Sequence, residues 1–324
     1  MIAPRLGFLG TGWIGRHRLA AMIAAGAEAV AVCDPADECV TEALKLVPAA
    51  RRVASLDAML ALDLDGVVIA TPSAQHAAQA IRALEAGKAV FCQKPLGRSA
   101  AEVTGVVDAA RAADRLLGVD LSYRHVAGID KVAELVRSGA LGKVFAADLV
   151  FHNAYGPDKP WFYDPAQSGG GCVIDLGVHL VDLALWVLGF PQVGDVDARL
   201  LRDGRPLAPG EVEDYATAQF SAGEAQVRIA CSWRLQAGRE AVIEAAFYGT
   251  DGGAALRNVD GSFYDFVVER FRGTAAERLA GPPDEWGGRA AAAWARQLAR
   301  DPRYASDADQ FVRSAEVLDR IYGR

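Results

Sequence analysis

The chain lacks the charge pattern of a protein that binds nucleic acid or an anionic membrane surface. Its 41 acidic residues outnumber its 34 lysines and arginines, the formal net charge is −7, and no run of basic residues is longer than Arg51–Arg52. Binding to a polyanion needs clustered positive charge. We therefore expect neither a nucleic-acid partner nor a membrane partner.

Targeting segments and paired cysteines are also lacking. No uninterrupted apolar run reaches the ~18 residues of a membrane-spanning helix. The first residues lead almost directly into the apolar stretch RLGFLG, without the basic and apolar regions of a secretory signal. Scattered cysteines without CxxC spacing are typical of reduced thiols in a cytoplasmic protein, not of a disulfide framework or zinc site. The five are Cys33, Cys39, Cys92, Cys172 and Cys231.

The apolar segments predict two domains of different architecture. In the first third, strand-like stretches alternate with helix-like ones, a pattern typical of βαβ units around a parallel sheet. After about residue 122, a helix and a Gly-rich aromatic loop lead into strand-like stretches with short connections, which favour an antiparallel sheet. With 324 residues, 52% of them hydrophobic, the chain has enough sequence for two cores. We expect an α/β domain at residues 1–121 and an α+β domain at residues 122–324.

The stretch GTGWIG lies between the first predicted strand and a helix. Its three glycines suit a tight turn, close approach of the backbone to a pyrophosphate, and packing of the helix on the strand. The helix N-terminus adds free N–H groups and a positive dipole for the phosphates. An ordinary glycine-rich turn fits the motif alone, but its position favours a dinucleotide site. The predicted cofactor residues are Gly10, Thr11, Gly12, Trp13, Ile14 and Gly15.

The second strand ends at Asp34, 19 residues after Gly15. A carboxylate there accepts hydrogen bonds from the ribose hydroxyls of NAD and repels the 2′-phosphate of NADP. Pro35 and Ala36 follow, so no adjacent arginine is offered to such a phosphate. The sequence therefore favours NAD over NADP. The alternative is that Asp34 only begins a turn with Pro35.

The third strand ends in ATPSAQH. Loops after the carboxyl ends of strands line the ligand crevice of such a sheet, so Thr71, Pro72 and Ser73 are expected beside the cofactor. His76 is a candidate neighbour of a phosphate or ribose. A lone histidine at a helix start is also a common partner of the local backbone, and we favour that interpretation.

The same rule places Lys94 at the crevice end of its strand. Pro95 restricts the local backbone, so the origin of the lysine side chain is rigid. A lysine aimed in this way can polarise a substrate oxygen or keep a neighbouring group deprotonated. A surface lysine at a strand end is the alternative.

In CVIDLGVHLVD, Asp175 and His179 lie four residues apart, on one face of the predicted helix. Oxidation of an alcohol needs a base for the hydroxyl proton. Histidine titrates in the right range, and a carboxylate beside it orients the ring. The alternatives are a surface pair or two metal ligands, and no third ligand is evident. We expect no metal.

Three stretches resemble the glucose–fructose oxidoreductase/inositol dehydrogenase/MocA family: GTGWIG, VVIATPSAQHAAQAIRALEAGKAVFCQKPLG and SGGGCVIDLGVHLVDLALWVLG. The resemblance runs from about residue 5 to residue 190. It implies a Rossmann domain, a C-terminal domain with an open, mainly antiparallel sheet, and a homodimer or homotetramer formed through that sheet. It also implies NAD(P)-dependent oxidation or reduction at a carbon of a sugar, cyclitol or related polyol.

The resemblance also implies roles for individual residues. Lys94 matches the lysine of the family's E-K-P motif, and Asp175 and His179 match its D-x-G-x-H motif. We expect His179 to carry the proton, Asp175 to orient it and Lys94 to assist. The chain departs from the pattern at Gln93, which stands where the family has glutamate near the nicotinamide ribose. Glutamine still accepts a hydrogen bond but lacks the charge that would help to keep Lys94 protonated.

The substrate is expected to contact the start of the second domain. Aromatic, amide and imidazole side chains suit a polyhydroxylated ring, although Trp161 and Tyr163 would also serve to pack their loop. The candidates are Tyr123, Arg124, His152, Asn153, Trp161 and Tyr163.

We expect an NAD-dependent oxidoreductase that acts on a sugar-like hydroxyl or keto carbon. Two alternatives stay open. One is an NAD-dependent enzyme with a non-redox net reaction, such as glycosidic cleavage through a keto intermediate. The other is a redox-silent NAD-binding regulator, which would need no proton relay.

Overall fold

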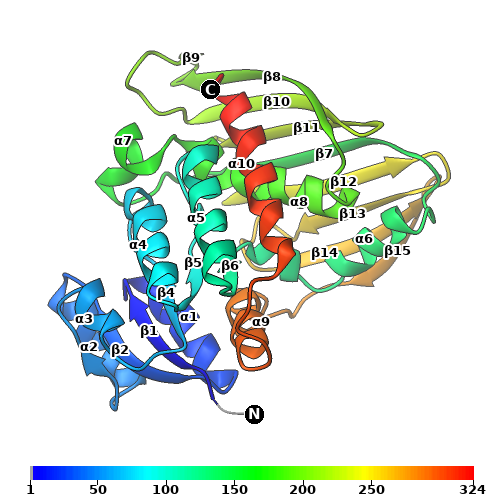
Figure 1. Cartoon of the computed structure of the whole chain (residues 1–324). Coiled ribbons are helices and arrows are strands. Elements are labelled where there is room, and N and C mark those ends of the chain that lie inside the picture. Colours follow the sequence, from blue (N-terminus) through cyan, green and yellow to red (C-terminus); the bar gives the residue numbers. More distant parts are fainter. Residues whose placement is uncertain (1–2) are drawn as a thin grey trace. The chain divides into compact units, whose positions relative to one another are not determined.

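The computed structural model describes residues 3–324 and divides the chain into two compact units, each built around one sheet (Figure 1). Unit 1 holds the chain up to Asp120 together with Gly288–Val312, and unit 2 holds Leu121–Gly287 and Arg313–Arg324. The first boundary between the two units follows Asp120, one residue before the boundary that was expected after residue 121. The segment Gly288–Val312 differs from the expectation, which had placed it in the second domain.

Unit 1 has a six-stranded parallel sheet in the order β3-β2-β1-β4-β5-β6. The chain places β2 and β3 on one side of β1 and then β4, β5 and β6 on the other side. The strand order therefore reverses between β1 and β4, which leaves a crevice outside the carboxyl ends of these two strands. The expected α/β architecture is confirmed. The strands are β1 (Arg5–Leu9), β2 (Glu28–Cys33), β3 (Arg51–Arg52), β4 (Gly66–Ile69), β5 (Ala89–Cys92) and β6 (Leu117–Val119).

Helices alternate with these strands along the chain, as expected. They are α1 (Trp13–Ala24), α2 (Asp37–Leu46), α3 (Leu56–Leu60), α4 (Ser73–Glu85) and α5 (Ala100–Ala113). The short elements β3 and α3 were not anticipated, because neither is long enough to show a hydrophobic period.

Helix α9 (Arg289–Leu298) joins unit 1 through Trp294. The indole lies 5.6 Å from the Phe91 ring between centroids. Two strand glycines make room for it: a Cβ at Gly118 would lie 2.5 Å from Trp294 Cδ1, and one at Gly66 would lie 2.9 Å from Trp294 Cη2. Because α9 lies far along the chain from these strands, no local sequence pattern predicted that it packs on this sheet.

Unit 2 has a nine-stranded sheet in the order β15-β14-β13-β12-β7-β11-β10-β8-β9. Neighbouring strands are antiparallel except β7 and β11, which are parallel. The expected open, mainly antiparallel sheet is confirmed, although β9, β13 and β15 were not anticipated. The strands are β7 (Val144–Asn153), β8 (Val193–Arg202), β9 (Arg205–Pro206), β10 (Tyr215–Ala222), β11 (Ala225–Ser232), β12 (Ala241–Gly249), β13 (Gly253–Asn258), β14 (Phe266–Arg272) and β15 (Ala275–Ala280).

One face of this sheet is buried under helices. On β7, Ala147, Leu149 and Phe151 are buried in a core that also contains Leu180 and Val181 of α8. The helical elements of unit 2 are η1 (Ser122–His125), α6 (Ile129–Arg137), η2 (Pro160–Tyr163), α7 (Pro165–Ser168), the π turn η3 (Val173–Gly177) and α8 (Val178–Leu188), whereas η4 (Ser306–Ala308) belongs to unit 1. The closing helix α10 (Asp309–Ile321) crosses the division at Val312.

The helical stretch Pro165–Leu188 is long and apolar enough to cross a membrane by length and composition. This differs from the expectation, which considered only uninterrupted apolar runs. Of the apolar window, 78% is buried inside the protein, and core helices pass the same test. Burial against the sheet of unit 2 is a sufficient reason for its apolar character.

Candidate active site

The glycine turn after β1 has the shape that a dinucleotide site needs. Gly10 has φ +86°, and a Cβ there would lie 2.4 Å from Ala70 O. A Cβ at Gly15 would lie 2.1 Å from Gly10 O, so the start of α1 approaches the turn closely only with glycine. At Gly12, by contrast, a Cβ would meet no atom of the described chain within 4 Å. The turn is therefore tight on its inner side and open at Gly12, beside the free N–H groups of α1.

Asp34 holds this turn in place. Its Oδ2 accepts a hydrogen bond from Thr11 N at 2.7 Å, and its Oδ1 accepts one from Ala36 N at 2.9 Å. Asp34 therefore begins the turn after β2 and also ties that turn to the glycine motif. Carboxylate oxygens have further lone pairs, so the side chain keeps acceptor capacity for a ribose.

Two other residues of the motif differ in their surroundings. The indole of Trp13 is 65% exposed. The hydroxyl of Thr11 is buried and has no hydrogen-bond partner within residues 3–324. A buried hydroxyl without a partner beside an open turn fits a site that a polar ligand completes.

His76 links the ends of two strands. Its Nδ1 lies 2.7 Å from Pro95 O and its Nε2 lies 2.6 Å from Thr71 O. Only an imidazolium donates to both carbonyls, whereas burial, the largest effect, lowers the pKa of His76. We therefore infer that the neutral ring of His76 donates to only one of these two carbonyls at a time near neutral pH. This contact with the local backbone is the role that we favoured from the sequence, and it anchors the segment after Lys94.

Gln93 directly follows β5 and is buried. Its side-chain Nε2 donates to Asp120 Oδ2, and Arg18 Nε donates to the same oxygen. Asp120, which follows β6, is a negative charge that the sequence alone did not place beside position 93. A carboxylate is thus present beside Gln93, although it belongs to another residue.

Asp175 and His179 lie in unit 2, at a junction between two kinds of helical turn. Asp175 belongs to the π turn η3, and His179 lies in the first turn of α8. Trp233 Nε1 donates to Asp175 Oδ2 at 3.0 Å. The Tyr123 ring meets the His179 imidazole edge-on, with 4.9 Å between centroids. Single π turns inside helices are frequent at functional sites.

Glu213 holds the N-terminus of this helical segment. Its Oε1 accepts hydrogen bonds from Gly171 N at 3.0 Å, from Val173 N at 2.9 Å and from the Tyr322 hydroxyl at 2.8 Å. The glycine run is required here, since a Cβ at Gly171 would lie 2.0 Å from Glu213 O and one at Gly170 would lie 2.0 Å from Tyr322 Oη. Burial raises the pKa of Glu213, while these donors oppose the shift.

Tyr123 and Arg124, two of the predicted substrate residues, have partners inside unit 2. Burial raises the pKa of Tyr123, with a contribution from Asp175, so its phenol stays protonated and is a poor base. Arg124 makes two hydrogen bonds to Asp182, at 2.8 and 2.6 Å, and stacks on Phe190 at 5.4 Å. Its guanidinium forms this ion pair within unit 2.

The remaining predicted substrate residues lie at the end of β7 and in the loop after it. His152 Nδ1 lies 2.8 Å from Ser232 Oγ, and burial lowers the pKa of this histidine. Asn153 accepts from Tyr155 N at 2.7 Å. Trp161 stacks on Phe162 at 3.8 Å. The Tyr163 hydroxyl donates to Pro157 O at 2.9 Å, accepts from Arg234 at 3.0 Å, and its ring contacts Trp233 at 5.7 Å.

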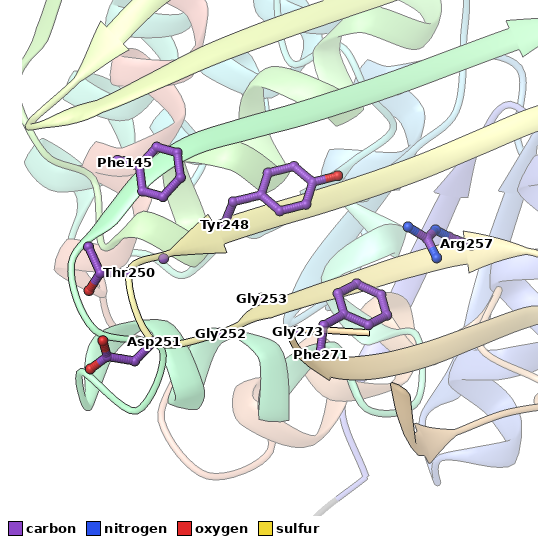
Figure 2. Close-up of a pocket in the computed structure, with 10 residues that line it drawn as sticks. Phe145, Tyr248, Thr250, Asp251, Gly252, Gly253, Arg257, Phe271 and Gly273 are labelled. Atoms are coloured by element: carbon purple, nitrogen blue, oxygen red, sulfur yellow. The ribbon is translucent and has the colours of Figure 1, made fainter. Parts of the chain in front are cut away.

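A hollow of about 560 Å³ lies on the sheet of unit 2, around the turn that joins β12 and β13 (Figure 2). Aromatic rings from β7, β12 and β14 border it, with Arg257 at one side. No residue predicted from the sequence for the cofactor or substrate lines this hollow. Its lining includes Phe145, Tyr248, Asp251, Arg257 and Phe271.

Three residues that support the candidate site were missed by sequence analysis: Asp120, Glu213 and Trp233. Each acts on a residue that a motif did identify. Glu213 lies just before β10 and Trp233 lies just after β11. Their partners Val173 and Asp175 are 40 and 58 residues away along the chain.

Among residues 3–324, no group of three or more His, Cys, Asp or Glu side chains could hold a metal ion.

Comparison with known proteins identifies both parts of the chain. A model of an oxidoreductase family with an NAD-binding Rossmann fold matches residues 5–121, and a model of the GFO/IDH/MocA C-terminal domain matches residues 129–255. The solved structure of GenD2 from gentamicin A biosynthesis, in complex with NAD, has a TM-score of 0.83 at 25% identity, covering 100% of this chain and 94% of that one.

Curated relatives match over shorter spans. The D-glucoside 3-dehydrogenase of Escherichia coli K12 is 27% identical over 211 residues, which is 61% of this chain and 60% of that protein. The inositol 2-dehydrogenase of Rhizobium meliloti strain 1021 is 30% identical over 257 residues, which is 78% of this chain and 76% of that protein. The chain belongs to the glucose–fructose oxidoreductase/inositol dehydrogenase/MocA family.

Proposed function

We propose that the protein is an NAD-dependent dehydrogenase that moves a hydride between nicotinamide and a hydroxyl or keto carbon of a sugar, cyclitol or related polyol. The observation that carries the proposal is the placement of Asp175 in η3 and of His179 in the first turn of α8, with Asp175 held by the indole of Trp233. A protein that only sensed the cofactor would need no oriented carboxylate beside a histidine. The names of the relatives support the substrate class, since they act on a D-glucoside and on inositol.

The cofactor proposal is based on the turn after β1. The open side at Gly12, the buried hydroxyl of Thr11 and the acceptor capacity of Asp34 fit a dinucleotide pyrophosphate and its ribose. We propose NAD over NADP because the Asp34 carboxylate would repel a 2′-phosphate. Trp13, Ile14, Thr71, Pro72 and Ser73 are proposed to flank the cofactor.

Bound NAD would supply the hydride acceptor for oxidation of the substrate carbon. His179 would take the proton from the substrate hydroxyl as that carbon becomes a carbonyl. Asp175 would orient the imidazole and stabilise its cationic form, while its own position is set by the Trp233 N–H. Lys94, which matches the lysine of the family's E-K-P motif, would polarise the substrate oxygen.

Substrate recognition is proposed to involve the end of β7 and the following loop. The neutral imidazole of His152, the amide of Asn153 and the ring of Trp161 offer directional hydrogen bonds and a flat apolar surface for a sugar ring. The Tyr163 hydroxyl has two protein partners, so its expected contribution is through its ring.

A panel of sugars, glycosides and cyclitols, incubated with the protein and NAD, tests the proposal through the absorbance of NADH. We expect at least one compound to produce NADH, and His179→Asn to remove most of that activity. His125→Asn is the matched control, because His125 lies in η1 outside the proposed chemistry. Full activity of His179→Asn would overturn the assigned base.

A second candidate is a reaction with no net redox change, in which a transient keto intermediate permits cleavage of a glycosidic bond. The same residues would serve it. Recovered sugar that contains solvent deuterium, without net NADH, would favour this candidate over the dehydrogenase.

We further propose a cytoplasmic homodimer or homotetramer that assembles through the open face of the unit 2 sheet. That face combines paired charges, such as Arg228 with Asp148 at 2.7 Å, with the aromatic hollow around Tyr248 and Phe271. Mixed apolar and paired polar surface is typical of interfaces between subunits. The five free thiols are consistent with a reducing compartment.

A further inference from the structure

Three buried polar side chains of unit 1 form a set that the proposed chemistry does not explain. They come from α1, from the end of β5 and from the end of β6: Arg18, Gln93 and Asp120, which are 6%, 8% and 1% exposed. Arg18 Nε and Gln93 Nε2 both donate to Asp120 Oδ2. Arg18 Nη1 also lies 2.9 Å from His17 Nδ1.

The set determines which way the Gln93 carboxamide points. An ionised carboxylate only accepts hydrogen bonds, so the amide nitrogen of Gln93 must face Asp120 and the amide oxygen must face away. The backbone is equally constrained, since Gln93 N donates to Ile69 O at 2.8 Å and Asp120 N donates to Cys92 O at 2.9 Å. Gln93 thus presents one rigidly oriented acceptor at the carboxyl ends of the strands, where the crevice of the sheet lies.

We propose that Asp120 is a positioning residue for the cofactor. It holds the Gln93 carboxamide so that Oε1 accepts a hydrogen bond from a hydroxyl of the nicotinamide ribose. It also carries the negative charge that E-K-P members of the family carry at position 93. The ribose contact rests on the proposed NAD-dependent function, whereas the pairing of Gln93 with Asp120 does not.

The pairing explains why glutamine stands at this position. A glutamate there would place a carboxylate oxygen against Asp120 Oδ2, where the Nε2 donor now lies. Two buried carboxylates in contact disfavour each other's ionisation, and the donor that stabilises Asp120 would be lost. Glutamate at position 93 beside aspartate at position 120 is therefore destabilising, while glutamate at position 93 with asparagine at position 120 restores one charge and one donor.

A double-mutant cycle on the protein without cofactor tests the pairing. Gln93→Glu, Asp120→Asn and the double variant are compared by urea unfolding. We expect each single variant to lower the folding equilibrium constant by about tenfold or more, the equivalent of about 1.4 kcal/mol. The double variant should recover most of that loss, because the introduced asparagine accepts from Arg18 and donates to the introduced glutamate.

The matched control is Gln297→Glu, which makes the same charge change at an exposed position of α9 in unit 1. Gln297→Glu should change the free energy of unfolding only slightly. Equal effects of Gln93→Glu and Gln297→Glu, or additive effects of the two single changes in the double variant, would overturn the pairing.

Calorimetric titration with NAD tests the ribose contact separately. Gln93→Met keeps the length of the side chain but removes the acceptor, and we expect it to raise the dissociation constant by about tenfold. The double variant keeps an acceptor and should stay within about threefold of the wild type. An unchanged affinity of Gln93→Met would overturn the ribose contact alone. A wild-type protein that does not bind NAD would overturn that contact and the proposed function together, and leave the pairing to the unfolding data.

Discussion

The hydroxyl of Tyr322 is the smallest group whose removal tests how the segment that carries Asp175 and His179 is held. It donates to Glu213 Oε1 at 2.8 Å, and the same carboxylate accepts from Gly171 N and Val173 N. Tyr322→Phe removes one donor and leaves the ring in place. The carboxylate of Glu213, which is 0% exposed, then keeps only its backbone donors.

The magnitude follows from the charge and burial of the acceptor. A hydrogen bond to a charged group contributes about 1.5–3 kcal/mol, so we expect Tyr322→Phe to lower the free energy of unfolding by about 2 kcal/mol near neutral pH. That is a large part of a total stability of about 5–15 kcal/mol. The ring stays, so no large cavity adds to the loss.

The loss should also depend on pH. Burial raises the pKa of Glu213 and the Tyr322 hydroxyl opposes that shift, so Tyr322→Phe raises the pKa further. A carboxyl whose pKa is higher in the folded state than in the unfolded state stabilises the protein at low pH, and this contribution is lost as pH rises through the folded pKa. The deficit of the variant should therefore be smallest near pH 4 and grow towards about pH 8.

Urea unfolding of both proteins across this pH range is the assay. Tyr304→Phe is the matched control, because its hydroxyl donates to Asp309, a carboxylate that is 51% exposed in its side chain. The control should lose less than about 1 kcal/mol. An equal loss in both variants, or a Tyr322→Phe deficit that does not change with pH, would refute the account of Glu213.

Two further variants test single contacts at the proposed site. Trp233→Phe removes the N–H that donates to Asp175 Oδ2, which should loosen the orientation of that carboxylate and lower kcat/KM. Trp286→Phe loses only a 2.8 Å bond to a backbone carbonyl and should lower kcat/KM less, and an equal kcat/KM in the two variants contradicts the role of Trp233. Asp34→Asn keeps an acceptor for Thr11 N but removes the charge, so the ratio of NADP to NAD affinity should rise about tenfold or more in calorimetric titrations. An unchanged ratio would mean that Asp34 serves only the turn.

Much of the fold could be predicted because local signals were strong. The GTGWIG motif predicted a turn between a strand and a helix, which the structure has. Ser99 caps the start of α5 locally, since its Oγ accepts from Glu102 N at 3.3 Å. The parallel pairing of β7 with β11 could not be predicted, because no local pattern specifies which distant strands become neighbours.

The candidate site was predicted as a set of motif residues without their supports. Asp120 and Trp233 carry no motif, and each becomes meaningful only through the tertiary contact that it makes. Arg124 was expected to contact the substrate, and the sequence did not show that Asp182, 58 residues away, pairs with it within unit 2. Sequence spacing identified reactive residue types, whereas the structure identified what orients them.

Hydride transfer from a sugar-like carbon to NAD is tested most directly by the mass of the NADH formed from carbon-perdeuterated sugars and cyclitols in ordinary water. We expect NADH that is heavier by one deuterium, with the label lost in His179→Asn because turnover stops. NADH without deuterium, or labelled NADH formed at the wild-type rate by His179→Asn, would overturn the proposed transfer.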